Sequence, residues 1–151
     1  MERYAARLGA VCAFFITAET AYATGIGDVL SPADSPKGNL VGYHLVVVKP
    51  GVAVSTREAY ARITPRHPAK CCRDVVRQPI DTWRDELTND FETPVFEAHP
   101  ELGDIKRRLY EAGAAYAQMS GSGSALFGIF ADAPRDMKAS FDGCDVFEMK
   151  L

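Results

Sequence analysis

The chain has 151 residues, of which 47% are hydrophobic and 25% charged, with 12 glycines and 9 prolines. This composition is typical of one globular domain and excludes a wholly disordered chain, which would be poorer in aromatic residues and richer in charge. The 17 basic and 20 acidic side chains leave a net charge of -3. A chain so close to neutral has no basic surface for a phosphate backbone, so we do not expect nucleic acid as a partner.

The first 23 residues allow two interpretations. Two arginines followed by an apolar run of nine residues and an Ala-Tyr-Ala sequence resemble a secretory signal. Such a run is too short to span a bilayer, so no membrane anchor is expected. The alternative is a helix over Glu2–Ala10 that Gly9 ends, followed by a buried strand over Cys12–Ile16 and a short element over Ala21–Leu30.

Turn residues in Ser31–Gly38 mark a boundary, which divides the chain into residues 1–38 and 39–151. The β-branched run His44–Lys49 then predicts a buried strand. A helix should follow over Thr56–Ile63, because Ser55 is a good N-cap and Glu58 stands at the spacing of a capping box.

The middle of the chain alternates a basic connection with helical patterns. Thr64–Pro79 is rich in proline and basic residues, and we interpret it as a solvated loop rather than an anion site. Apolar spacing predicts an amphipathic helix over Asp81–Ala98, which Pro94 should break in two. A further helix should begin at Pro100, bury a stripe and end at Gly113. The stripe consists of Leu102, Ile105, Leu109 and Ala112.

The last third predicts three strands and a helix: strands over Ala115–Met119, Ala125–Ala131 and Asp145–Met149, and a helix over Pro134–Ser140. From residue 44 onward the order is therefore β-α-β-β-α-β. This succession is the ferredoxin-like split β-α-β arrangement, in which helices cover an antiparallel sheet. The fold class that we predict is α+β.

Two segments carry residues that suit ligand binding. The Ser/Gly run Met119–Ala125 can form either an anion nest or an ordinary hairpin loop. Pro50–Thr56 leaves a buried strand and enters a helix N-terminus, where amide groups favour polar ligands. Local chemistry favours packing of Tyr60 on the core and a capping role for Asn89–Glu92. The four cysteines and three histidines match no metal-site spacing, so no metal ligand and reduced thiols are expected.

Together these segments resemble the carboxyl-terminal half of the 4-diphosphocytidyl-2-C-methyl-D-erythritol kinases, a family of the GHMP kinase superfamily. Five motifs in the family's order carry the resemblance: LGAVCAFF at 8–15, AYATGIGDVLSP at 21–32, HLVVVKPGVAVSTREAY at 44–60, NDFETPVF at 89–96 and YAQMSGSGSALFGIF at 116–130. Residues 1–38 would then be a remnant of the amino-terminal domain and 39–151 the carboxyl-terminal domain. The apolar start is thereby explained without a signal, which favours the cytoplasm.

The resemblance implies the chemistry of an ATP-dependent small-molecule kinase. The family uses ATP and magnesium to phosphorylate a hydroxyl of a diphosphocytidyl sugar alcohol, in the non-mevalonate route to isoprenoid precursors. Matched by position, Ser55 and Thr56 lie where the cytidine end is held, and Tyr60 corresponds to an aromatic ring that stacks on cytosine. Four residues match the loop that supports the ATP-phosphate region, namely Gly121, Ser122, Gly123 and Ser124.

Two departures from the family pattern lead us to expect no kinase activity from this fragment. The family's catalytic Asp corresponds to Val11, which can neither accept a proton nor pair with an ammonium group. The 151 residues also lack the family's G-L-G-G-G-S-S loop and amino-terminal Lys. Strand edges left unpaired in residues 1–30 could favour self-association. The alternative function is a non-catalytic ferredoxin-like module that binds a nucleotide or a protein.

Overall fold

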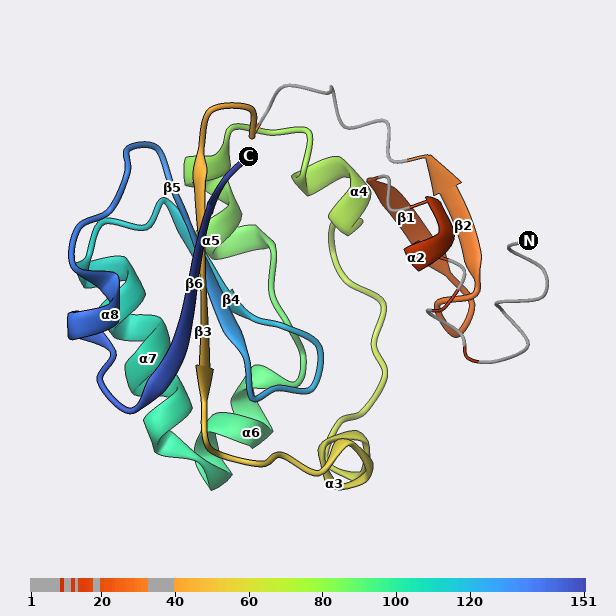
Figure 1. The fold of residues 1–151 in the computed structure, drawn as a ribbon. Helices are drawn as coiled ribbons and strands as arrows, with labels where there is room; N and C mark the ends of the chain where they lie inside the picture. The colour runs from red at the N-terminus through yellow and green to blue at the C-terminus, as the bar shows by residue number, and fades with distance from the viewer. Residues whose placement is uncertain (1–8, 10–11, 13, 18–19, 33–39) are drawn as a thin grey trace. The chain divides into compact units, whose positions relative to one another are not determined.

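The computed structural model divides the chain into two compact units, residues 1–38 and 39–151, which we describe separately (Figure 1). It describes the following residues: 9, 12, 14–17, 20–32 and 40–151. None of the helices in this part of the chain has the length and hydrophobicity that a bilayer-spanning segment needs.

In the first unit the structure describes one helical turn and one hairpin. The turn, α2, spans Phe14–Thr17. The predicted strand over Cys12–Ile16 is therefore wrong, because a short apolar run by itself does not distinguish a strand from a helix. The predicted helix over Glu2–Ala10 and the position of Val11 lie outside the described residues.

The hairpin replaces the single short element that we predicted over Ala21–Leu30. Strands β1 (Ala21–Thr24) and β2 (Val29–Pro32) pair antiparallel in a two-stranded sheet. Gly25 and Gly27 in the connecting turn have φ values of 70° and 94°. Only glycine adopts such angles without strain, which explains why the chain reverses here.

The second unit is built on a four-stranded sheet in the order β4-β5-β3-β6, all antiparallel between neighbours. Its strands are β3 (His44–Pro50), β4 (Tyr116–Met119), β5 (Leu126–Phe130) and β6 (Cys144–Lys150). This order confirms the predicted α+β class and the ferredoxin-like arrangement. Because β3 and β4 are both antiparallel to β5, they run in the same direction, with β5 between them (Figure 1).

The helices of this unit occupy the two crossovers. The first crossover holds α3 (Thr56–Ala61), α4 (Cys72–Val75), a 3-10 turn η1 (Ile80–Thr82), α5 (Trp83–Glu86), α6 (Glu92–Ala98) and α7 (Pro100–Glu111). The second holds α8 (Met137–Ser140). Prolines and glycines in the sequence punctuate both crossovers, so most of these helices are a single turn or two.

Helix α7 supplies the main core contact. Its residues Leu102, Ile105 and Leu109 are buried and pack with Val46 and Val48 of the central strand β3. The fourth residue of the predicted stripe, Ala112, is exposed because it is the C-cap of the helix. Gly113 follows with a φ of 98°, so the prediction that α7 ends here is confirmed.

A second hydrophobic cluster covers the opposite face of the sheet, since alternate residues of β3 and β5 belong to the two clusters. Tyr116 and Ile129 are buried there against Trp83 and Val75, which come from α5 and α4. The tyrosine hydroxyl donates a hydrogen bond to the carbonyl of Leu87 at 2.9 Å. Part of the predicted Thr64–Pro79 loop is therefore helical and packed, since Val75 is fully buried.

Candidate functional site

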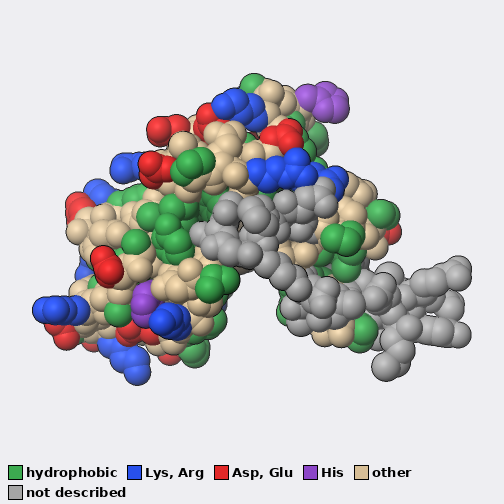
Figure 2. All heavy atoms as spheres, turned by 90° about the horizontal axis from the view of Figure 1, so that it is seen from above, with side chains coloured by type: hydrophobic (Ala, Val, Ile, Leu, Met, Phe, Trp, Pro, Cys, Tyr) green, Lys and Arg blue, Asp and Glu red, His purple; other side chains and the backbone are tan. Residues whose placement is uncertain are grey.

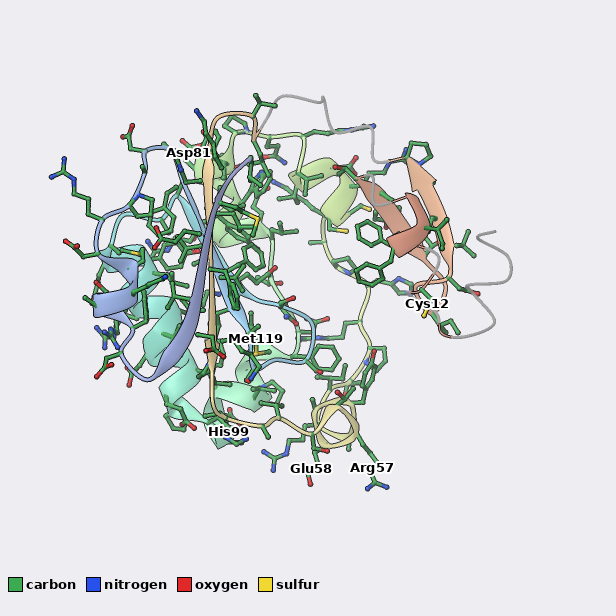
Figure 3. The ribbon with its side chains drawn as sticks, in the orientation of Figure 1. Cys12, Arg57, Glu58, Asp81, His99 and Met119 are labelled. Atoms are coloured by element: carbon green, nitrogen blue, oxygen red, sulfur yellow. The ribbon has the colours of Figure 1, made fainter. Side chains whose placement is uncertain are left out.

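Two segments far apart in the sequence meet beyond the ends of two parallel strands. Strand β3 ends at Pro50 and leads through residues 51–55 into α3, whereas β4 ends at Met119 and leads into the Ser/Gly loop 120–125. Because β3 and β4 run in the same direction, both exits lie at one edge of the sheet. Figure 3 labels Met119 at this edge, with Arg57 and Glu58 of α3 pointing away from it.

Side-chain hydrogen bonds join the two segments. The hydroxyl groups of Thr56 and Ser122 lie 3.1 Å apart, and the Ser124 hydroxyl donates to the carbonyl of Val52 at 2.5 Å. Ser124 is buried, with 4% of its surface exposed. The structure thus brings together Thr56, which the family resemblance assigns to the cytidine end of the substrate, and Ser122, which it assigns to the ATP-phosphate region.

Ser55 acts as the N-cap of α3, as its position predicted. Its side-chain oxygen accepts a hydrogen bond from the Glu58 N–H at 3.4 Å. The hydroxyl hydrogen is still available to a ligand, because a serine hydroxyl both accepts and donates. The helix ends at Ala61, two residues before the predicted Ile63.

Tyr60 lies one turn into α3 and is 62% exposed, so the prediction that it packs in the core is wrong. Its ring meets Phe91 edge to face, with centroids 4.8 Å apart and an angle of 72° between the planes. This contact fixes the ring at one edge and leaves most of the residue's surface open, which suits a ring that stacks on a ligand.

The Ser/Gly loop has features of both a hairpin loop and an anion nest, the two forms that its sequence allowed. It closes as a hairpin, since the Ser120 N–H donates to Ala125 and the Gly123 N–H donates to Ser120. Gly121 and Gly123 have φ values of 55° and 91°. A Cβ at residue 123 would lie 2.8 Å from the Met119 sulfur, so a larger side chain would displace Met119 and adopt a strained backbone angle.

Several amide groups of this loop are not used within the described part of the chain. The N–H groups of Gly121, Ser122 and Ser124 have no hydrogen-bond acceptor there. Amides of this kind beside glycines in left-handed conformations are the components of an anion nest. The loop can therefore present donors to a phosphate group.

Asn89 is a site residue whose role the sequence did not reveal. Its side-chain amide donates to the carbonyls of Met119 and Gly121, at 2.8 and 2.7 Å. Its side-chain oxygen accepts from the Phe91 N–H at 3.0 Å. Helix α6 begins without a side-chain cap, so the capping role that we predicted for Asn89–Glu92 is wrong. Asn89 thereby ties the start of the Ser/Gly loop to the segment that carries Phe91.

Glu92 was also missed. It is 9% exposed, and one carboxylate oxygen accepts from the Met119 N–H at 2.8 Å. The other oxygen pairs with the Lys106 ammonium group of α7 at 2.6 Å. A carboxylate in this setting holds the end of β4 rather than capping a helix, and the only hint in the sequence is its place in the NDFETPVF motif.

The described residues do not form a metal site: no three His, Cys, Asp or Glu side chains among them gather in a way that could hold an ion. Magnesium is therefore not assigned to any residue of this part of the chain. Val11, which the family resemblance matches to a catalytic Asp, lies outside the described residues.

Comparison with known proteins places these features in a family. Residues 73–141 match the family model described as GHMP kinases C terminal. A 4-diphosphocytidyl-2-C-methyl-D-erythritol kinase of Bacteroides fragilis is 44% identical over 151 residues, which cover 100% of this chain and 54% of that protein. A kinase of the same name from Bacteroides thetaiotaomicron is 48% identical over 130 residues, which cover 86% of this chain and 46% of that protein.

A solved structure agrees with this relationship. The crystal structure of a 4-(cytidine 5'-diphospho)-2C-methyl-D-erythritol kinase superposes with a TM-score of 0.75 at 26% identity, covering 99% of this chain and 57% of that one. The chain thus spans about half the length of the relatives that it matches. It is related to the 4-diphosphocytidyl-2-C-methyl-D-erythritol kinases, and its second unit is a GHMP kinase carboxyl-terminal domain.

Proposed function

We propose that residues 39–151 supply the cytidine-binding half of a 4-diphosphocytidyl-2-C-methyl-D-erythritol kinase site and the loop that supports its ATP-phosphate region. The observation that carries this proposal is the hydrogen bond between Thr56 and Ser122. It joins the segment assigned to the substrate to the segment assigned to ATP, although 66 residues separate them.

In this proposal each group has a binding role. Ser55 and Thr56 offer hydroxyl groups to the cytidyl end of the substrate, and the exposed ring of Tyr60 stacks on the cytosine. The amides of Gly121, Ser122 and Ser124 face the phosphate groups of ATP. Such a site acts by positioning its substrates and by neutralising charge on the transferred phosphoryl group.

We further propose that these 151 residues alone do not transfer phosphate. They contain no G-L-G-G-G-S-S loop, and Val11 stands where the family has its catalytic Asp. An isopropyl side chain can neither orient nor deprotonate the attacking hydroxyl. The remaining activity would be binding, in the cytoplasm.

Calorimetry with CDP tests the binding half of the proposal. We expect the chain to bind CDP, and Tyr60→Ala to weaken binding by about fivefold to 150-fold, since a base-stacking contact contributes roughly 1–3 kcal/mol. Tyr60→Phe is the matched control, because it keeps the ring and should bind as the wild type does. Equal affinity of all three proteins, or no heat with any nucleotide, would refute the pocket; the second result would favour a protein-interaction module.

A kinase assay tests the inactivity. ATP and 4-diphosphocytidyl-2-C-methyl-D-erythritol should yield no phosphorylated product with the purified chain, and Val11→Asp should not restore turnover. Product formation by the wild-type chain would contradict this part of the proposal while leaving the cytidine pocket to the calorimetric test.

A further inference from the structure

Strand β6 lies at the edge of the four-stranded sheet and exposes large hydrophobic side chains. Phe147 is 56% exposed and Met149 48%, and Leu151 directly after the strand is 41% exposed. These alternate residues share one face, whereas Val146 on the other face packs against the main core. Hydrophobic side chains also lie between charged ones on the face seen from above in Figure 2.

The backbone of β6 shows which residues face the open edge. The Leu151 N–H donates to Tyr43, and the Leu151 carbonyl accepts from Gly42, both at 2.9 Å, so residue 151 directs its polar groups toward the β3 side. The direction of the backbone N–H and C=O groups alternates from residue to residue along a strand. Those of Met149 therefore also point toward β3, and those of Glu148 and Lys150 point to the open edge. The edge therefore offers donors and acceptors to another strand.

We propose that β6 binds β6 of a second copy of this chain, antiparallel, around a two-fold axis at Met149. In this register the outward groups of Glu148 and Lys150 in one copy pair with those of Lys150 and Glu148 in the other, in four backbone hydrogen bonds. Each Glu148 side chain then lies opposite a lysine, and each Phe147 lies opposite Leu151 of the second copy. The result is a continuous eight-stranded sheet.

Charge and hydrophobicity select this register over its neighbours. An axis at Glu148 would place two glutamates opposite each other, which is unfavourable. An axis at Phe147 would oppose Asp145 to Met149 and Val146 to Glu148, so that each charge would meet an apolar group. Of these three axes, the one at Met149 alone matches unlike charges and apolar side chains together.

The charges that the interface uses are available in the single chain. Neither Glu148 nor Lys150 has an ion-pair partner among the residues that the structure describes. Pairing across the axis would therefore form new ion pairs without breaking existing ones. The same edge, left open, would be a general hazard for aggregation, which a defined two-fold contact removes.

Charge exchange tests the proposal in the full 151-residue chain. Sedimentation equilibrium should show a monomer–dimer equilibrium for the wild type, and Glu148→Lys or Lys150→Glu alone should raise the dissociation constant by about tenfold, since each places like charges opposite each other. An equimolar mixture of the two variants should dimerise like the wild type, as should the double variant. A monomeric wild type at all concentrations, or single variants that dimerise normally, would overturn the proposal.

Disulfide trapping tests the axis itself. Met149→Cys should form a covalent dimer on mild oxidation, because facing residues at the axis have Cβ atoms about 4.5–5.5 Å apart. Phe147→Cys is the control: it lies two residues from the axis, so its two thiols would be about 13 Å apart and should not join. The exposed Cys72 sets the background of crosslinking in the wild type. Equal crosslinking of both variants, or no crosslinking above this background, would place the contact elsewhere.

Discussion

Asn89 shows how one side chain shapes the Ser/Gly loop. Its amide group spans the carbonyls of Met119 and Gly121, so the first turn of the loop cannot open without breaking two hydrogen bonds. The glycines of the loop have the freedom to take many conformations when nothing holds them. We infer that Asn89 selects the conformation in which Ser122 reaches Thr56.

Replacing this amide should loosen the loop. Asn89→Asp keeps the acceptor for Phe91 but puts a carboxylate beside two carbonyl oxygens, and we expect it to lower the free energy of unfolding by about 1–3 kcal/mol. Urea unfolding measures the change. Asp90→Asn is the control, because it makes the reverse exchange at the adjacent exposed position, and it should leave the unfolding midpoint unchanged. Equal unfolding midpoints for both variants would contradict the role of Asn89.

At this site the sequence predicted the local contact but not the contacts between residues far apart in the chain. The bond between Ser55 and Glu58 joins residues three positions apart, so the spacing alone predicted it. Asn89 bonds residues 30 and 32 positions away, and Glu92 bonds one 27 positions away. No local pattern marks such partners, because they depend on how β4 is placed beside α6.

At the level of elements, the predicted break at Pro94 is wrong. Pro94 is the third residue of α6, where an N–H has no partner within the helix and its loss costs little. The chain leaves the helix earlier, after Glu86, and resumes at Glu92. The missed helix α4 has a different cause: Val75 is buried in a cluster with Trp83, Tyr116 and Ile129, and local spacing does not show these contacts.

The connection between α3 and α4 is fixed at its end by an ion pair. Lys70 donates to the Glu86 carboxylate of α5. The hydrogen bond and charge of Lys70 lower the pKa of Glu86 below its ordinary value. The folded state therefore prefers the ionised carboxylate more strongly than the unfolded chain does.

This preference predicts a pH dependence. The stabilisation from Glu86 should be fully present above the carboxyl's ordinary pKa and should disappear as the pH falls through its lowered pKa in the folded state. Glu86→Gln should therefore destabilise the chain at neutral pH and have no effect in strong acid. Thermal unfolding across this pH range measures the difference in stability between the wild type and Glu86→Gln. Glu97→Gln, at an exposed position, is the control. A difference in stability that persists in acid would exclude the ion pair as its cause.

On the scale of the whole molecule, the two units are unequal in their cores. In the part of the chain that the structure describes, the members of both hydrophobic clusters are residues from 40 onward. None of the described residues of the first unit belongs to either cluster, and its described sheet is a single hairpin. A two-stranded hairpin alone is at best marginally stable in water.

We therefore expect residues 39–151 to fold by themselves. A protein limited to these residues should unfold cooperatively in urea, with a midpoint close to that of the 151-residue chain. Circular dichroism and the fluorescence of Trp83, the single tryptophan, report the transition. A fragment without a cooperative transition would show that residues 1–38 contribute to the stability of the second unit.

Residues 64–69 are exposed and lie between α3 and the ion-paired Lys70, and they take no part in the hydrogen bonds at the Ser/Gly loop. The entropy of closing a loop rises only slowly with its length. This span is consequently where the fold tolerates insertion best, and where evolution could vary length, or an engineer could place an affinity tag or fluorophore, without moving Thr56 away from Ser122.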